Sequence, residues 1–375
     1  MSMYKKRIKQ VKKELRNRGL DALIVTSWEN LYYLLGVLPL HSIERLFYPT
    51  MPLLISSEDD KGEIFCPFTS FAKTTCEEHA YIGDIRPYSG KFPHISKVVS
   101  QILEEWKLSS GNIGLEYKYV STFFGDLIRE KTSMAAFKDC SDLVERIRMV
   151  KSEEEKVYCI KACEITNKVL ESAEDFLRAG KTEMDIAREI TRRLIEYGAD
   201  GASFHPQVFS GVRGLLASIT SSRDKKIQNG DVVLLDFGAA YNGYRCDTTR
   251  PFVIGRSTKE QREVAEAIRC IIEGTVKSIH PGIKASDVHD AAVSKFSEQG
   301  YPCFEDGTGH GMGLQTWELP FLTSAGQIVL RPNMFLAIEH TIHKSTYGMR
   351  FEENIFVTET GCVDYIKFPM ELVEV

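Results

Sequence analysis

Five residues with metal-ligand chemistry stand in the second half of the chain, in segments that otherwise have the composition of buried structure. A buried carboxylate is costly unless a cation or a metal ion compensates its charge. The histidine stands among four glycines in the segment GTGHGMG (307–313), where the absence of side chains lets the backbone approach a ligand closely. The five residues are Asp236, Asp247, His310, Glu339 and Glu352.

Oxygen-rich ligation with one imidazole nitrogen suits Mn²⁺, Co²⁺, Fe²⁺ or Zn²⁺. Two such ions would neutralise four carboxylates, activate a water molecule and polarise a carbonyl group. The alternative is that each carboxylate is an ordinary strand or salt-bridge residue, with Arg245 or Arg350 as its partner. The concentration of all five residues in apolar strands and one glycine-rich turn favours the metal site.

Strand pairing predicts which of these side chains meet. The segments 231–238 and 244–253 flank Asn242-Gly243, the strongest short signal for a hairpin. If Asn242-Gly243 is a two-residue loop, Asp236 opposes Thr249, and Asp247 shares the face of Asp236. Such diagonal neighbours lie roughly 7–8 Å apart at Cα, so both carboxylates could reach one ion pair.

A second pair of strands is predicted over 334–340 and 349–358, and it could place Glu339 opposite Glu352, although its longer loop leaves the register open. The strands alternate with helical patterns, which indicates an α+β domain with a largely antiparallel sheet. The helices are expected over 152–177, from a cap at Thr182 to Gly198, and over about 259–278 and 287–299.

The first part of the chain has the pattern of an α/β domain. Its composition changes near Met149, and 375 residues exceed the usual length of one domain, so we expect domains at 1–149 and 150–375. Helices are predicted over 6–18 and 99–108, and strands over 20–26, 51–56, 63–68 and 112–117.

Composition narrows the class of protein. The net charge of −5 gives no global attraction to nucleic acid. No apolar run approaches the roughly 20 residues of a membrane helix, and the charged N-terminus does not have the pattern of a signal peptide. Nine irregularly spaced cysteines fit reduced thiols. We therefore expect a cytoplasmic protein that binds neither nucleic acid nor membranes.

Several segments resemble, in order and spacing, the pita-bread metallopeptidase family, which includes prolidase, aminopeptidase P, methionine aminopeptidase and the metal-free creatinase. They are LLDFGAAYNGYRCDTTRPF, GTGHGMGLQTWELP, LAIEH and MRFEENIFVTETG. The stretch LDALIVTSWENLYYLLGV resembles the N-terminal domain of the prolidase and aminopeptidase P branch. The resemblance covers essentially the whole chain.

This resemblance implies roles for individual residues. It makes Asp236, Asp247, His310, Glu339 and Glu352 the ligands of two divalent metal ions, Mn²⁺ or Co²⁺ before Zn²⁺ or Fe²⁺. It makes Glu339 a proton shuttle as well, and Arg350 the residue that supports the metal carboxylates. It also implies a homodimer.

Two substrate-contacting histidines of that branch are replaced, since Ser218 and Trp317 stand at their positions. Three other histidines could substitute for them, namely His205, His340 and His343, although a surface or packing role is the simpler interpretation of each. Trp317 could form an apolar or cation-binding wall, or it could be a packing residue.

The predicted function is a dinuclear metallohydrolase of the Xaa-Pro dipeptidase or aminopeptidase type, in which metal-bridged hydroxide attacks an amide carbonyl. Two alternatives stay open. The same metal site could act on a small non-peptide substrate as a C–N hydrolase or lyase, or the chain could be a non-catalytic binding homologue.

Overall fold

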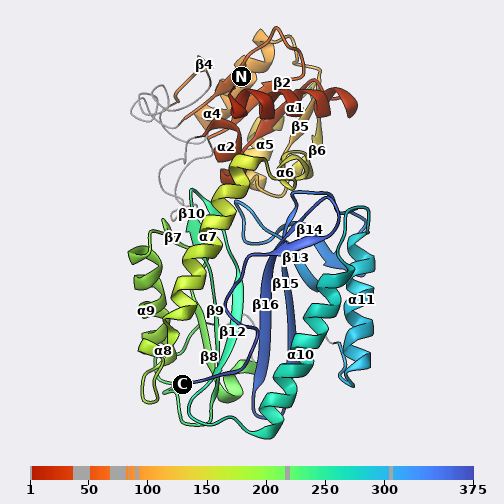
Figure 1. The fold of residues 1–375 in the computed structure, drawn as a ribbon. Coiled ribbons are helices and arrows are strands. Elements are labelled where there is room, and N and C mark those ends of the chain that lie inside the picture. The colour runs from red at the N-terminus through yellow and green to blue at the C-terminus, as the bar shows by residue number, and fades with distance from the viewer. Residues whose placement is uncertain are drawn as a thin grey trace. The chain divides into compact units, whose positions relative to one another are not determined.

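The computed structural model describes residues 2–36, 51–67, 82, 84–88, 93–215, 220–303 and 307–375. The chain divides into two compact units, Met1–Arg148 and Met149–Val375. Figure 1 shows that helices and a sheet make up the first unit, and that helices flank several sheets in the second. None of the helices in the described ranges has the length and apolar character that spanning a bilayer requires.

The first unit is built on a six-stranded mixed sheet with the order β4-β3-β2-β1-β5-β6. Strand β1 pairs antiparallel with β2 and parallel with β5, which confirms the α/β character that the sequence predicts. The strands are β1 (Ala22–Val25), β2 (Leu53–Ser56), β3 (Glu63–Phe65), β4 (Asp84–Ile85), β5 (Asn112–Leu115) and β6 (Ala136–Asp139). The helices are α1 (Met3–Asn17), α2 (Trp28–Leu35), α4 (Pro93–Glu105), α5 (Thr122–Lys131) and α6 (Ser141–Arg148).

The described residues of the second unit form three sheets, with the orders β11-β10-β7, β18-β12-β9-β8 and β14-β13-β15-β16-β17. Among the strands just named, every pairing except β12 with β18 is antiparallel, so the expected α+β domain is confirmed. The strands of the first two sheets are β7 (Gly201–Ala202), β8 (Gln207–Ser210), β9 (Val232–Phe237), β10 (Ala239–Tyr241), β11 (Tyr244–Arg245), β12 (Thr248–Val253) and β18 (Val373–Glu374). Those of the third sheet are β13 (Gly307–Gly311), β14 (Glu318–Thr323), β15 (Phe335–His343), β16 (Gly348–Val357) and β17 (Cys362–Asp364).

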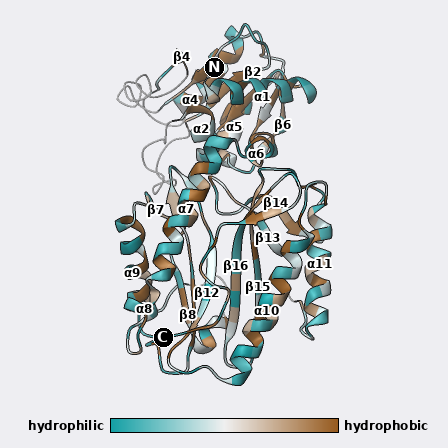
Figure 2. Ribbon diagram, viewed as in Figure 1, coloured by the Kyte–Doolittle hydropathy of each residue, from teal (hydrophilic) through white to brown (hydrophobic). Residues whose placement is uncertain are grey.

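Helices cover these sheets. Helix α10 packs on β15 and β16, α11 on β13 and β14, α7 on β10 and β11, and α9 on β7 and β8 (Figure 1). The mixed colouring of α10 in Figure 2 reflects a helix with apolar residues on one face, which is buried against the third sheet. The helices are α7 (Glu153–Glu171), α8 (Ala173–Phe176), α9 (Glu183–Glu196), α10 (Lys259–Ser278) and α11 (Ala285–Glu298), with the 3₁₀ turn η1 at Gly211–Leu215.

Capping residues set the starts of three of these helices. Reciprocal capping boxes join Ser152 to Glu155, Thr182 to Asp185, and Thr258 to Gln261. The helix predicted over 152–177 is interrupted, because α7 ends at Glu171 and the short helix α8 follows Ser172.

The hairpins have the register that the metal-site prediction needs. Asn242 and Gly243 both have positive φ, as a two-residue hairpin turn requires, and Asp236 opposes Thr249. Glu339 opposes Glu352 in the β15–β16 pair. Strands β12 and β16 also lie side by side, since the Thr249 hydroxyl donates to Glu352 Oε2 at 3.0 Å.

Candidate metal centre

Three of the predicted ligand residues converge from three strand regions. Asp247 lies between β11 and β12, His310 lies in β13, and Glu352 lies in β16. One ligand atom from each lies within 4.8 Å of the other two, and all three residues are buried. Asp247 is held in place by Asn354, whose side-chain amide exchanges two hydrogen bonds with the Asp247 backbone.

The other two predicted ligands line the same space. A cavity of about 230 Å³ is bounded by Asp236, Asp247, Glu339, Glu352, Arg350, Phe204, Gln207, Thr316 and Trp317. Arg350 joins two of the carboxylates, because its Nη1 lies 3.2 Å from Asp236 Oδ2 and 3.5 Å from Glu339 Oε2. Its Nε donates to Thr341 Oγ1 at 3.1 Å, which fixes the direction of the guanidinium.

Burial and mutual repulsion favour the protonated forms of three of the carboxylates, Asp236, Asp247 and Glu352. Burial raises the pKa of Asp236 to about 7, and this outweighs the opposing effect of Arg350. Burial, together with neighbouring carboxylates, raises the pKa of Asp247 and of Glu352 well above their usual values. A cation bound among them would remove this cost.

The imidazole of His310 is arranged as a metal ligand would be. Burial lowers its pKa, so the neutral ring is favoured. Its Nδ1 lies 3.1 Å from the carbonyl oxygen of Gly311, a contact that requires the proton on Nδ1. Its buried Nε2 has no hydrogen-bond partner among the described residues and lies 3.8 Å from Asp247 Oδ2 and 3.9 Å from Glu339 Oε1. An acceptor nitrogen beside buried carboxylates fits a divalent cation.

The glycines around His310 have a different purpose from the expected one. A Cβ at Gly309 would lie 2.2 Å from the Ala337 carbonyl oxygen, and one at Gly311 would lie 2.2 Å from that of Leu319. The close approach is therefore to the neighbouring strands β15 and β14, and it allows β13, which carries His310, to pair on both sides.

The model of metallopeptidase family M24 matches residues 158–359, and the creatinase/prolidase N-terminal domain matches residues 7–150. The chain belongs to metallopeptidase family M24. It is accordingly a hydrolase of a metal-dependent family, and the pita-bread fold expected from the resemblance is confirmed.

Several M24 relatives align over their full length. The chain is 27% identical to the Xaa-Pro dipeptidase of Pyrococcus horikoshii over 375 residues, which is 100% of both chains. Among solved structures, a recombinant prolidase from Thermococcus sibiricus has a TM-score of 0.90 at 26% identity, covering 100% of both chains. An Xaa-Pro dipeptidase from Bacillus anthracis has a TM-score of 0.89 at 26% identity, covering 99% of this chain and 100% of that one.

The predicted substrate-binding residues of this M24 protein have different positions. The Trp317 side chain lines the cavity, is 63% exposed, and has its ring centroid 5.0 Å from that of His310. His205 is exposed and lies between the cavity residues Phe204 and Gln207, but it does not line the cavity. Ser218 lies outside the described residues.

The other two histidines do not reach the cavity. His340 is fully buried on the face of β15 opposite Glu339, where its Nε2 lies 3.1 Å from Thr275 Oγ1 and its ring packs edge-on against Phe296. A catalytic role for His340 is therefore not supported. His343 shares the face of Glu339 but is exposed four residues farther along β15, about 13 Å at 3.3 Å per residue.

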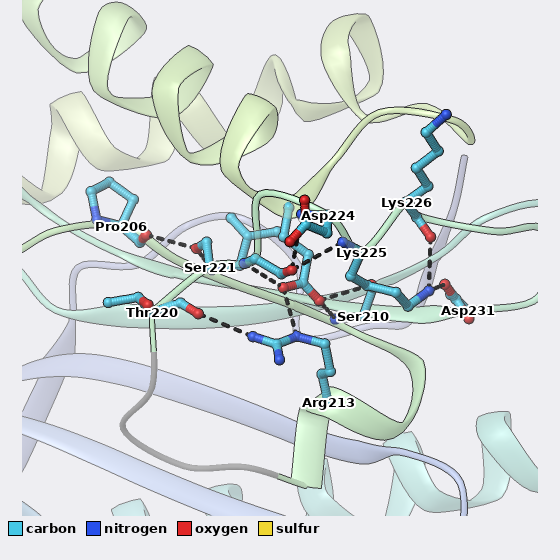
Figure 3. Close-up of polar contacts among 12 residues, drawn as sticks. Pro206, Ser210, Arg213, Thr220, Ser221, Asp224, Lys225, Lys226 and Asp231 are labelled. Carbon is cyan, nitrogen blue, oxygen red and sulfur yellow. Dashed lines mark hydrogen bonds and ion pairs between the residues drawn. The ribbon is translucent and has the colours of Figure 1, made fainter.

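The segments on either side of residues 216–219 are tied together by polar contacts. Arg213 Nη2 donates to the Thr220 carbonyl at 3.0 Å, and the Ser221 hydroxyl donates to the Pro206 carbonyl at 3.2 Å, as Figure 3 shows. The buried carboxylate of Glu183 accepts from the backbone N–H of Ser210, from Arg213 Nε and from the Ser222 N–H. This network ties Ser210, at the end of β8 away from Gln207, to Arg213 and Ser222.

Sequence reasoning did not identify Phe204, Gln207 or Thr316 as cavity residues. Gln207 opposes Asp236 in the pair formed by β8 and β9. This pairing could not be deduced because the sequence analysis predicted no strand at β8. Phe204 and Thr316 lie outside strands, where no periodic pattern marks the buried face.

Proposed function

We propose that the chain hydrolyses the peptide bond that precedes proline, as an Xaa-Pro dipeptidase or Xaa-Pro aminopeptidase. The observation that supports this best is the cluster of Asp247, His310 and Glu352 ligand atoms within 4.8 Å of one another, in a cavity that Asp236, Glu339 and Arg350 also line. The names of its full-length relatives, Xaa-Pro dipeptidase and prolidase, support the choice of substrate.

The proposed cofactor is a pair of divalent cations, Mn²⁺ or Co²⁺ in preference to Zn²⁺ or Fe²⁺, because the donor set is four carboxylates and one imidazole. The residues that would hold them are Asp236, Asp247, His310, Glu339 and Glu352. When bound, such ions act as Lewis acids on a carbonyl oxygen and supply a nucleophile at neutral pH.

The residues of the chain have separate tasks in this proposal. Glu339 carries the proton to the leaving nitrogen, since its side chain is 21% exposed and is the most accessible of the four carboxylates to a substrate or to water. Arg350 forms ion pairs with both Asp236 and Glu339 and so holds the two carboxylates in fixed directions. Phe204 and Trp317 supply apolar surface against which a proline ring can pack.

The test is a panel of Xaa-Pro dipeptides and Xaa-Pro-Xaa tripeptides, offered to Mn²⁺- or Co²⁺-loaded protein, with metal content measured on the same sample. Glu352→Ala is the control. Cleavage before proline that is lost in Glu352→Ala is the expected result. Absence of cleavage by protein that holds its metal would overturn the Xaa-Pro proposal.

A second candidate rests on Trp317. Its exposed indole faces an acidic cavity, and an indole face attracts quaternary or protonated nitrogen. A small zwitterionic amide is therefore the alternative substrate. Turnover of such compounds, with no cleavage of the proline panel, would favour it over the peptidase.

A further inference from the structure

The connection between β13 and β14 starts two residues after His310 and carries Thr316 and Trp317 to the cavity. A buried ion pair stands at its far end. Lys151 Nζ lies 2.8 Å from Glu318 Oε1, and the two side chains are only 1% and 2% exposed. Removing two charges from water in this way has a large desolvation cost. Other contacts that the pair makes must offset this cost.

The ion pair is packed directly against the backbone of this connection. Glu318 Oε2 accepts a hydrogen bond from the Gln315 N–H at 3.3 Å. A Cβ at position 313 would lie 2.4 Å from Glu318 Oε1, so the contact requires Gly313. Arg245 holds the same connection through its backbone N–H, which donates to the Gly313 carbonyl at 2.9 Å, and through its Nε, which donates to the Leu314 carbonyl at 3.0 Å.

The anchored connection surrounds the imidazole of His310. The carbonyl oxygen of Gly311, directly before the connection, accepts a hydrogen bond from the ring Nδ1. The Trp317 indole covers one side of it, at 5.0 Å between centroids. Nε2 is the ring nitrogen that stays without a hydrogen-bond partner in the described structure, and it is directed toward Asp247 and Glu339.

We infer that Lys151 and Glu318 are positioning residues for His310: by fixing the β13–β14 connection, they hold the proton on Nδ1 and leave the lone pair of Nε2 for a metal ion. The inference rests on the metal site of the proposed function and adds to it two residues that do not touch the metal, the substrate or the cavity. Partners that orient a ligating histidine in this way contribute strongly to metal affinity.

A purely structural ion pair would behave differently, and the variants separate the two roles. Lys151→Met and Glu318→Leu each leave one member of the pair, whereas Lys151→Met/Glu318→Leu removes both charges. Replacing a whole buried pair by apolar side chains often restores stability. The double variant cannot restore the anchor, because Leu offers no acceptor to the Gln315 N–H.

Mn²⁺ affinity measured by titration calorimetry, alongside the unfolding midpoint of each variant, is the test. We expect the dissociation constant to rise about 10–100-fold in all three variants, and to stay raised in the double variant even where its midpoint recovers. Glu183→Gln is the matched control, since Glu183 is a buried carboxylate of the same unit that ties a different loop. This control variant should lower the unfolding midpoint and change the Mn²⁺ dissociation constant by less than twofold.

The outcomes that contradict the inference are distinct from failure of the proposed function. Wild-type affinity in Glu318→Leu, in a protein whose His310→Ala variant binds Mn²⁺ weakly, would overturn the positioning role and leave the metal site intact. A double variant that recovers both stability and affinity would assign the pair a structural role only. Absence of Mn²⁺ binding to the wild-type protein would overturn the proposed function, and the inference with it.

Discussion

Removing metal should make the stability of the protein depend on pH in a direction that Asp236 determines. Its pKa is about 7 in the folded structure against a usual value of 3.8, because burial disfavours the charged form. The folded protein therefore keeps a proton up to about pH 7 that the unfolded chain loses above 3.8. The resulting stabilisation is fully present below pH 3.8, is lost as the pH rises to 7, and stays absent above it.

The magnitude follows from the same values. At about 1.4 kcal/mol for each pKa unit, the separation between 3.8 and about 7 corresponds to about 4 kcal/mol in total. About 3 kcal/mol of this falls between pH 5 and pH 8. The pKa values of Asp247 and Glu352 are raised as well. Their ionisation therefore also lowers the free energy of unfolding as the pH rises.

The assay is urea unfolding of chelator-treated protein at pH 5, 6, 7 and 8, compared with the Asp236→Asn variant, which has no proton to lose at this position. The free energy of unfolding should fall more steeply with pH in the wild type than in the variant. Saturating Mn²⁺ should raise the free energy of unfolding of the wild type most at pH 8, where the carboxylates are charged. Parallel pH profiles of the two metal-free proteins would refute the reasoning.

Three further predictions concern single side chains. Glu352→Gln removes a ligand and should lower kcat/KM for an Xaa-Pro peptide by at least about 100-fold at fixed Mn²⁺, which steady-state kinetics can measure; an active variant would exclude Glu352 as a ligand. Trp317→Ala changes an exposed residue, so the free energy of unfolding should shift by no more than about 0.5 kcal/mol while KM rises several-fold; an unchanged KM would make Trp317 a bystander. His340→Ala opens a cavity beside Thr275 and should cost about 2–4 kcal/mol in calorimetric unfolding without changing kcat; the reverse pattern would return His340 to the catalytic set.

Strand pairing could be predicted from the sequence where a short turn sets the register. The Asn242-Gly243 loop determines the length of its hairpin, so the pairing of Asp236 with Thr249 could be predicted and is confirmed. Glu339 does oppose Glu352, although the longer β15–β16 loop left that pairing open. The alternation of side chains along β15 also explains His340, because a residue next to Glu339 must point to the other face of the sheet.

Contacts between segments far apart in the sequence could not be predicted. Lys151 and Glu318 are separated by 167 residues, and neither lies in a pattern that predicts a partner. The Glu183 network joins the start of a helix to two separate segments for the same reason. The identity and number of the metal ions, the homodimer and the cytoplasmic location stay predictions.

The measurement that tests the account most directly is anomalous diffraction at the manganese edge from crystals soaked in Mn²⁺. The account predicts a peak within about 2.0–2.4 Å of ligand atoms from Asp247, His310 and Glu352, with His310 contributing Nε2. Crystals saturated with Mn²⁺ that show no peak in this cavity, or a peak that His310 does not approach, would contradict it.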